Sequence, residues 1–171
     1  MKRLITISTI TALLFGACDR GATSPPPSNN GNGNGEGITY RIVDVYDGDT
    51  IELDDGQTIR LVGIDTPEMS PIEPCAEEAK TYTRTASLYK DCYLIYNTSV
   101  GDSIDIFGRT LAFVHILPDS SCLNIEIVRD GWSEDWDNYP VRGDYEALFE
   151  EAESQAIAAD RGIWDPGDNC E

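Results

Sequence analysis

Two acidic segments and two arginines are the residues of this sequence best suited to chemistry. The acidic segments are Asp47-Gly48-Asp49 and Asp65-Thr66-Pro67-Glu68, and the arginines are Arg60 and Arg109. If Asp49, Asp65 and Glu68 come together, their repulsion is on the order of 4 kcal/mol per pair at 4 Å in an effective dielectric of 20. A bound cation would relieve that repulsion. Carboxylates are hard oxygen ligands, which calcium and magnesium prefer and zinc and copper do not.

Turn formation is the simpler explanation of each acidic segment taken alone, because Asp, Gly and Pro are the residues that turns require. It does not explain Arg60, which interrupts the otherwise apolar run 59–64. A charged side chain in a strand that faces the core needs a partner. Arg109 follows Phe107-Gly108 at the start of another expected strand, which weakens the turn explanation further.

Hydrophobic periodicity from Ile38 onward predicts the elements that position these residues. Alternating apolar residues predict strands, and the Asp-Gly step within 54–57 predicts a hairpin. Apolar spacings of three and four predict helices, with glycines closing the second and third. The expected strands span 38–45, 50–53, 58–64, 92–96 and 109–117, and the expected helices span 75–89, 123–129 and 145–161.

This order of elements predicts the fold class. One helix follows the third strand and two follow the fifth, which favours a β-barrel plus α fold over a parallel α/β sheet. We expect a five-stranded Greek-key barrel of the OB-fold type with three helices. One domain over residues 38–171 is long enough to bury a core.

The N-terminal residues predict export. A basic start and the apolar run 4–15, which is too short to cross a bilayer, indicate a signal peptide over residues 1–17. Cys18 follows Leu14-Phe15-Gly16-Ala17, which resembles a lipoprotein processing site. Residues 18–37 would then be a lipidated cysteine and a disordered linker rich in Gly, Asn and Pro. We expect a lipoprotein anchored to a membrane through Cys18 and facing the periplasm or exterior; ordinary cleavage and secretion is the alternative.

Four cysteines follow Cys18, and an even number in an exported chain indicates two disulfide bonds with three possible connectivities. Cys92 begins one expected strand and Cys122 follows the next, so an antiparallel pair could bring them together. We therefore favour Cys92–Cys122 together with Cys75–Cys170. Buried free thiols are the alternative.

The strong negative charge of the chain bears on its partners. Acidic residues number 31 against 12 basic ones, for a formal charge of −19. An acidic surface repels phosphates over a Debye length of about 8 Å and gains nothing from counterion release. The composition therefore argues against tight nucleic-acid binding. It is compatible with a small or accessible substrate, or with work in high salt.

Taken together, these segments resemble the staphylococcal-nuclease-like (thermonuclease) family, from Tyr40 to Trp164. Besides the acidic segments and Arg60, the resemblance rests on Ile104–Ala112 with its Gly108-Arg109 step, on Leu123–Gly131 and on Ala156–Trp164. It implies a calcium-dependent nuclease that hydrolyses phosphodiester bonds of DNA or RNA and leaves 3′-phosphates. We expect a monomer with nucleic acid as its substrate.

The resemblance also implies a metal site. Asp49 and Asp65 would bind Ca²⁺ through their carboxylates, and Thr66 would bind it through its carbonyl oxygen. Glu68 would lie beside a metal-bound water, where the family's glutamate is the proposed general base. The implied metal site is therefore Asp49, Asp65, Thr66 and Glu68.

The implied catalytic residues are Glu68, Arg60 and Arg109. Both arginines would stabilise the transition state, and Arg109 would also assist the departing 5′ oxygen. The family has a basic residue and a tyrosine directly before the Gly-Arg step, where this chain has an isoleucine and Phe107. A phenyl ring can stack on a base but has no hydroxyl for a phosphate. Phe107, Trp136 and Tyr139 are thus the candidate substrate-stacking residues.

Two other functions remain open from the residues alone. The first is a non-catalytic OB-fold binding module at the cell surface, and the second is a surface protein stabilised by a structural calcium ion. Glu68 close to Asp65 and Arg60 argues against a pure binding role, for which a basic surface is expected. His115 lies between apolar residues of an expected strand, and we assign it no role.

Overall fold

The structure is a computed structural model that describes residues 38–97, 103–135, 141–167 and 170. The expected signal peptide, the linker and Cys18 lie outside the described residues, as do Trp136 and Tyr139. In the part that is described, no helix is long and apolar enough to cross a membrane.

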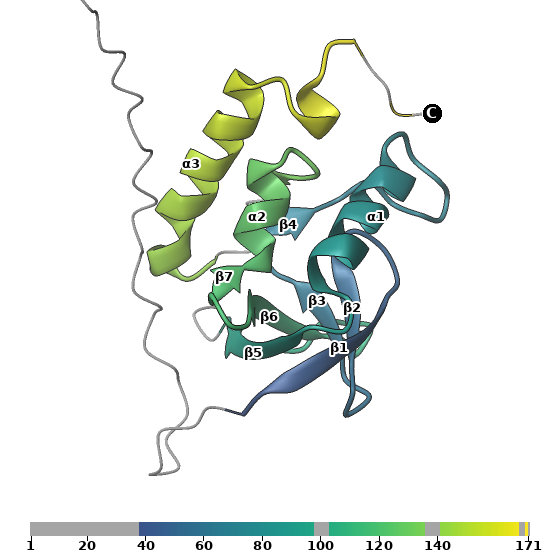
Figure 1. Cartoon of the computed structure of the whole chain (residues 1–171), viewed down its shortest axis with the longest axis vertical. Helices are drawn as coiled ribbons and strands as arrows, with labels where there is room; N and C mark the ends of the chain where they lie inside the picture. Colours follow the sequence, from purple (N-terminus) through teal and green to yellow (C-terminus); the bar gives the residue numbers. More distant parts are fainter. Residues whose placement is uncertain (1–37, 98–102, 136–140, 168–169, 171) are drawn as a thin grey trace, which may run out of the picture.

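Five strands close into the expected barrel (Figure 1). They are β1 (Tyr40–Val45), β2 (Thr50–Leu53), β3 (Thr58–Leu61), β5 (Asp91–Tyr96) and β6 (Thr110–Ile116). The spatial order is β3-β2-β1-β5-β6, and a parallel pairing of β3 with β6 completes the circle. The predicted five-stranded OB-type barrel is therefore confirmed.

The barrel interior is filled by the apolar residues of the alternating strand pattern. Its fully buried members include Ile42, Ile51, Leu53, Ile59, Leu61, Ile95 and Phe113. The tight turn at residues 54–57 fixes the β2–β3 register, with Gly56 at φ 84° and Glu52 opposite Thr58. This register matters to the site because it places Thr50 opposite Arg60.

Three helices gather on one side of the barrel in Figure 1. They are α1 (Ala76–Ser87), α2 (Leu123–Arg129) and α3 (Gly143–Ala158), and the 3₁₀ turn η2 (Gly162–Trp164) follows them. Helix α3 packs through the buried side chains Tyr145, Phe149, Ala152 and Ala156. The Tyr145 ring stacks on Phe113 of β6 with ring centroids 3.7 Å apart, which joins helix and barrel in one core.

The expected third strand is shorter than its apolar run. Strand β3 ends at Leu61, and Gly63, in the left-handed region at φ 78°, turns the chain out of the barrel. The next residues form β4 (Ile64–Asp65), which pairs with the unpredicted β8 (Glu134–Asp135). A second short strand, β7 (Ser121–Cys122), pairs with the end of β6 in antiparallel orientation. Two-residue strands carry no periodicity from which a sequence could predict them.

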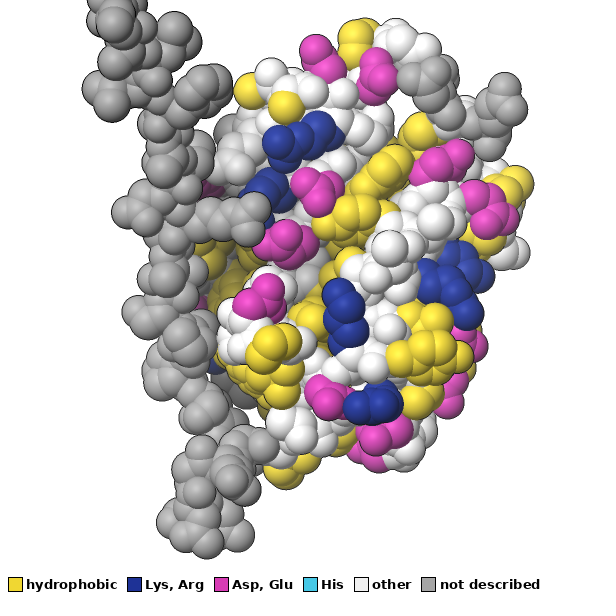
Figure 2. Space-filling view, viewed as in Figure 1, with side chains coloured by type: hydrophobic (Ala, Val, Ile, Leu, Met, Phe, Trp, Pro, Cys, Tyr) yellow, Lys and Arg dark blue, Asp and Glu magenta, His cyan; other side chains and the backbone are white. Residues whose placement is uncertain are grey.

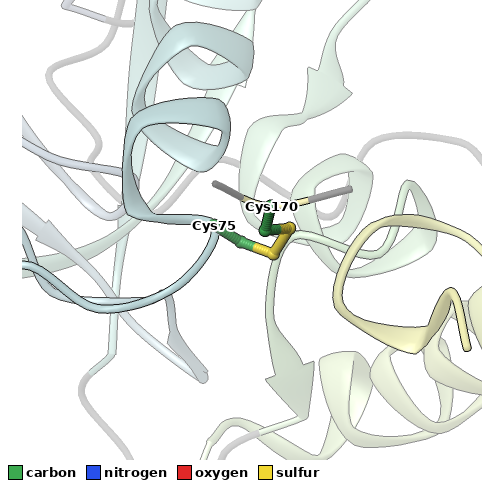
Figure 3. Close-up of a disulfide and its surroundings, with 2 residues drawn as sticks. All are labelled: Cys75 and Cys170. Atoms are coloured by element: carbon green, nitrogen blue, oxygen red, sulfur yellow. A yellow bond between two sulfur atoms is a disulfide. The ribbon is translucent and has the colours of Figure 1, made fainter. Parts of the chain in front are cut away.

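One of the two expected disulfide bonds is present. Cys75, the residue before α1, is bonded to Cys170 near the C-terminus (Figure 3). The bond joins residues 95 positions apart and ties the C-terminal segment to the first helix.

The expected Cys92–Cys122 bond is wrong, because both residues are free thiols. Cys92 is paired with Ile116 of β6, whereas Cys122 is paired with His115 on the other edge of the same strand. Strand β6 therefore separates the two cysteines. Two strand spacings amount to about 10 Å, beyond the roughly 7 Å that a disulfide can span between Cα atoms.

Candidate phosphate- and cation-binding site

Arg60 joins two of the predicted carboxylates at one end of the barrel. Its Nη2 lies 3.0 Å from Asp49 Oδ2 and 2.9 Å from Asp65 Oδ1. Its Nη1 donates to the carbonyl oxygens of Leu61 and Ile64, at 2.7 and 2.8 Å. Arg60 is buried, and a buried charge in an apolar strand needs partners. Two carboxylates and two backbone oxygens supply them.

Local structure explains why these side chains meet. Asp49 directly precedes β2, and the β2–β3 register sets its neighbour Thr50 opposite Arg60. The turn at Gly63 then brings Asp65 back beside the Arg60 guanidinium. Ser133 fixes the Asp65 backbone, because its Oγ accepts the Asp65 backbone N–H at 2.9 Å.

Asp49 is the buried carboxylate of the site. Burial raises its pKa to about 7, the charge of Asp47 adds to that effect, and the charge of Arg60 opposes it. Its Oδ1 accepts the Thr50 hydroxyl at 3.0 Å, and its Oδ2 accepts the Thr66 backbone N–H at 3.3 Å. The Thr50 hydroxyl, the Thr66 N–H and Arg60 therefore offset only part of the desolvation cost of an ionised Asp49.

Thr66 packs tightly against the acidic segment before β2. A side chain at Gly48 would meet the Thr66 Oγ1 at 2.5 Å, so only glycine allows this approach. The Thr66 Oγ1 is buried and finds no hydrogen-bond partner among the described residues. The Asp49 and Thr66 segments are thus in direct contact, as a shared ligand set requires.

Glu68 lies at the exposed rim of the site. Partial burial raises its pKa, and the nearby charges of Asp47 and Asp65 act in the same direction, while Arg60 opposes them. The Glu68 backbone N–H donates to Glu73 Oε2 at 3.0 Å. Its carboxylate is therefore within electrostatic reach of the Arg60 cluster and open to solvent.

Arg109 approaches the same cluster from the loop before β6. Its Nε donates to Asp105 Oδ2 at 2.7 Å, and its Nη1 donates to Thr50 Oγ1 at 3.2 Å. Phe107 is exposed at the tip of the loop, with the Arg109 guanidinium carbon 5.4 Å from its ring centroid. The structure thus brings Arg109 and Phe107 together beside the carboxylates.

Three supporting residues were not assigned a role from the sequence. Thr50 links Asp49 to Arg109, Ser133 binds the Asp65 backbone, and Asp105 orients Arg109. Only Asp105 had a usable signal, namely an acidic residue four positions before Arg109. Ser133 lies 68 residues from Asp65, so no local pattern relates them.

The donor set suits a hard divalent cation. Asp49 and Asp65 each place a carboxylate oxygen on Arg60 Nη2, and the raised pKa of Asp49 marks a carboxylate that a cation would stabilise. No group of three or more His, Cys, Asp or Glu side chains in the described ranges is close enough to hold a metal. A cation here would therefore also need the Thr66 carbonyl oxygen and oxygens of water or substrate.

The fold and the site together define a class: an OB-type barrel with two carboxylates and two arginines gathered at one end. Within that class, the chain belongs to the staphylococcal nuclease homologue family, whose model matches residues 58–166. A thermonuclease of Staphylococcus hyicus is 30% identical over 173 residues, covering 96% of this chain and 99% of the relative. A thermonuclease of Staphylococcus intermedius is 32% identical over 136 residues, covering 75% and 77%.

Proposed function

We propose that this protein is a calcium-dependent nuclease that hydrolyses phosphodiester bonds of DNA or RNA and leaves 3′-phosphates. Family membership and the thermonuclease relatives support nuclease activity. The observation that carries the finer proposal is the convergence of Asp49 and Asp65 on Arg60, with Arg109 joined to Asp49 through Thr50. This arrangement combines cation ligands and phosphate donors at one place.

The metal ligands of this proposal are the Asp49 and Asp65 carboxylates and the Thr66 carbonyl oxygen, with Glu68 at their edge. Calcium, when bound, supplies a Lewis acid and a template for the phosphate oxygens. The charge of the ion would lower the pKa of Asp49 and keep its carboxylate ionised.

The two arginines would bind the reacting phosphate. Each guanidinium stays charged, and Arg109 keeps a planar edge of terminal N–H donors that fits two phosphate oxygens. Arg60 is fixed by four acceptors and Arg109 by two side chains, so both would meet the substrate already oriented. We assign to Arg109 the further task of assisting the departing 5′ oxygen.

Glu68 would act on the attacking water. Its carboxylate is at the solvent-facing edge of the cluster, and its raised pKa makes it a better proton acceptor than an ordinary glutamate. A general base at this edge would direct the attacking water at phosphorus.

The proposal is tested by cleavage of end-labelled DNA and RNA oligonucleotides before and after removal of calcium with a chelator. Glu68→Gln should lower kcat by about 100-fold or more, as is typical for loss of a general base. The matched control is Glu150→Gln on the exposed face of α3, which should keep wild-type activity. Mass spectrometry of the products reports the 3′-phosphate.

Two outcomes would contradict the proposal. Undiminished cleavage after complete chelation would exclude the calcium mechanism. Binding of oligonucleotides without any cleavage, at every salt and calcium concentration, would instead favour the non-catalytic binding module.

We also propose that the protein acts outside the cytoplasm, anchored through lipidated Cys18. The Cys75–Cys170 disulfide supports an oxidising compartment. Mass spectrometry of the mature N-terminus tests the anchor: an acylated Cys18 is expected, and an unmodified first residue would show ordinary secretion.

A further inference from the structure

A buried threonine hydroxyl stands between the cation-binding carboxylate and the second arginine. Thr50 Oγ1 lies 3.0 Å from Asp49 Oδ1 and 3.2 Å from Arg109 Nη1, and Thr50 is only 4% exposed. We propose that Thr50 is a positioning residue that couples the Asp49 carboxylate to the orientation of Arg109. This inference rests on the nuclease function proposed above.

The chemistry of the two partners fixes the direction of both hydrogen bonds. A guanidinium only donates and an ionised carboxylate only accepts, whereas a hydroxyl has one hydrogen and two lone pairs. Thr50 must therefore donate to Asp49 and accept from Arg109. The Thr50 hydroxyl therefore hydrogen-bonds to the Asp49 carboxylate and to the Arg109 guanidinium at the same time.

The backbone holds the hydroxyl in place. Thr50 begins β2 and is paired with Arg60 of β3, so its side chain is on the face of the sheet that carries the site. A β-branched side chain in a strand has few χ1 rotamers. Thr50 therefore offers Arg109 an acceptor at a nearly fixed position.

Two fixed points determine how the Arg109 guanidinium is turned. Asp105 accepts the Nε hydrogen and Thr50 accepts one Nη1 hydrogen. A guanidinium has five N–H donors, so three remain, all on the two terminal nitrogens. These three form the edge that can hold phosphate oxygens. Without the Thr50 contact, the Arg109 guanidinium could rotate about its remaining hydrogen bond to Asp105. Its terminal N–H groups would then point away from the phosphate oxygens, which lowers the rate of the chemical step.

The experiment compares Thr50→Val, which keeps the shape and removes the hydroxyl, with Thr50→Ser, which keeps the hydroxyl. Thr50→Val should lower kcat about tenfold or more with KM changed less than about threefold, as for loss of a hydrogen bond to a charged group that acts in the transition state. Thr50→Ser should restore kcat to within about threefold of wild type. Thr58→Val in the neighbouring strand is the matched control and should leave both constants unchanged.

A second measurement does not depend on catalysis. Side-chain ¹⁵N relaxation of Arg109 in the metal-free protein should show a more mobile guanidinium in Thr50→Val than in wild type or Thr50→Ser. If Thr50→Val does not fold, Thr50→Ala is measured in the same way with the same expectation. Thermal unfolding establishes which variants are folded.

Three results would overturn the inference. They are an unchanged kcat in folded Thr50→Val, a loss of kcat in Thr50→Ser equal to that in Thr50→Val, and an Arg109 side chain that is no more mobile in Thr50→Val than in wild type. A wild-type protein that cleaves nothing would instead refute the nuclease function. In that case the relaxation measurement still decides whether Thr50 orients Arg109.

Discussion

Asp105 holds Arg109 by both its backbone and its side chain. The Asp105 Oδ1 accepts the Arg109 backbone N–H at 2.9 Å, and Oδ2 accepts the Arg109 Nε at 2.7 Å. Although partial burial alone would raise the pKa of Asp105, the hydrogen bonds from Arg109 and Phe107 lower it below its ordinary value. The ionised Asp105 carboxylate thus fixes both the backbone of the loop before β6 and the orientation of the Arg109 guanidinium.

Replacement of this anchor should impair catalysis more than stability. In Asp105→Asn one oxygen and the charge are lost, so the guanidinium keeps a weaker partner. We expect kcat to fall about tenfold, in line with loss of one charged hydrogen bond, and the unfolding free energy to fall by about 1 kcal/mol. Steady-state kinetics and urea unfolding measure the two effects. Asp119→Asn on an exposed turn is the control, and equal kinetic losses in both variants would refute the assignment.

Arg60 should contribute strongly to stability when no metal is bound. Arg60→Met leaves Asp49 buried without its counter-charge, and breaking one partner of a buried ion pair costs about 3–5 kcal/mol. Because protonation removes the charge of Asp49, the loss should be smaller at pH 5 than at pH 8. Urea unfolding of the chelated variant at both pH values measures it. A loss that does not depend on pH would show that the ion pair is not its cause.

The buried His115 predicts an acid-sensitive contribution to stability. Its Nε2 is 2.8 Å from the Tyr145 hydroxyl, its Nδ1 is 3.0 Å from the Ser120 carbonyl oxygen, and its ring stacks on Tyr93. Burial lowers the pKa of His115, and the hydrogen bond to Ser120 opposes the shift. The neutral ring therefore donates from Nδ1 to Ser120 and accepts the Tyr145 hydroxyl at Nε2.

A histidine with a lowered folded-state pKa binds fewer protons in the native state than in the unfolded state just below pH 6.5. Its contribution is therefore complete above pH 6.5 and declines as pH falls through that value toward the folded-state pKa. The wild-type unfolding free energy minus that of His115→Gln should decrease between pH 7 and pH 5. A constant difference across this range would contradict the prediction.

The cysteines should differ sharply in reactivity. Burial raises the pKa of both Cys92 and Cys122 to about 12, so neither forms a reactive thiolate at neutral pH. Without reductant, alkylation mapped by mass spectrometry should label these two only after unfolding, and should never label Cys75 or Cys170. Label on Cys75 in the unfolded, unreduced protein would show that its bond is absent.

The Cys75–Cys170 bond should stabilise the domain without taking part in the chemistry. It closes a long loop, and such bonds typically contribute about 2–4 kcal/mol. The double variant Cys75→Ala/Cys170→Ala should lose about that much unfolding free energy while its kcat below the melting temperature stays unchanged. A large fall in kcat would place the bond in the catalytic machinery.

The surface charge predicts an unusual response to salt. Every arginine in the described parts of the chain has a carboxylate partner within 3.6 Å, and Figure 2 shows acidic and basic side chains mixed on one face. With a net charge of −19, few cations remain to bind flanking phosphates. A plot of log(1/KM) against log[NaCl] should therefore have a slope near zero or positive. A slope of about −3 or steeper would reveal several phosphate contacts.

The sequence by itself determined the barrel and the charged residues that meet at the candidate site. Strand alternation, the Asp-Gly hairpin and the spaced helices are local signals, and each predicted element exists with ends shifted by a few residues. Asp49, Asp65 and Arg60 were recognisable because a charge near or within an apolar strand is costly without a partner.

Only the tertiary structure decided which groups touch. The pairing of Asp49 and Asp65 through one Arg60 nitrogen, the Thr50 link to Arg109 and the support of Asp65 by Ser133 all join residues from separate elements. The same is true of the cysteines, where an intervening strand separates Cys92 from Cys122. Closure of the barrel, not any local pattern, sets these distances, because strand order and register place side chains that the sequence keeps far apart.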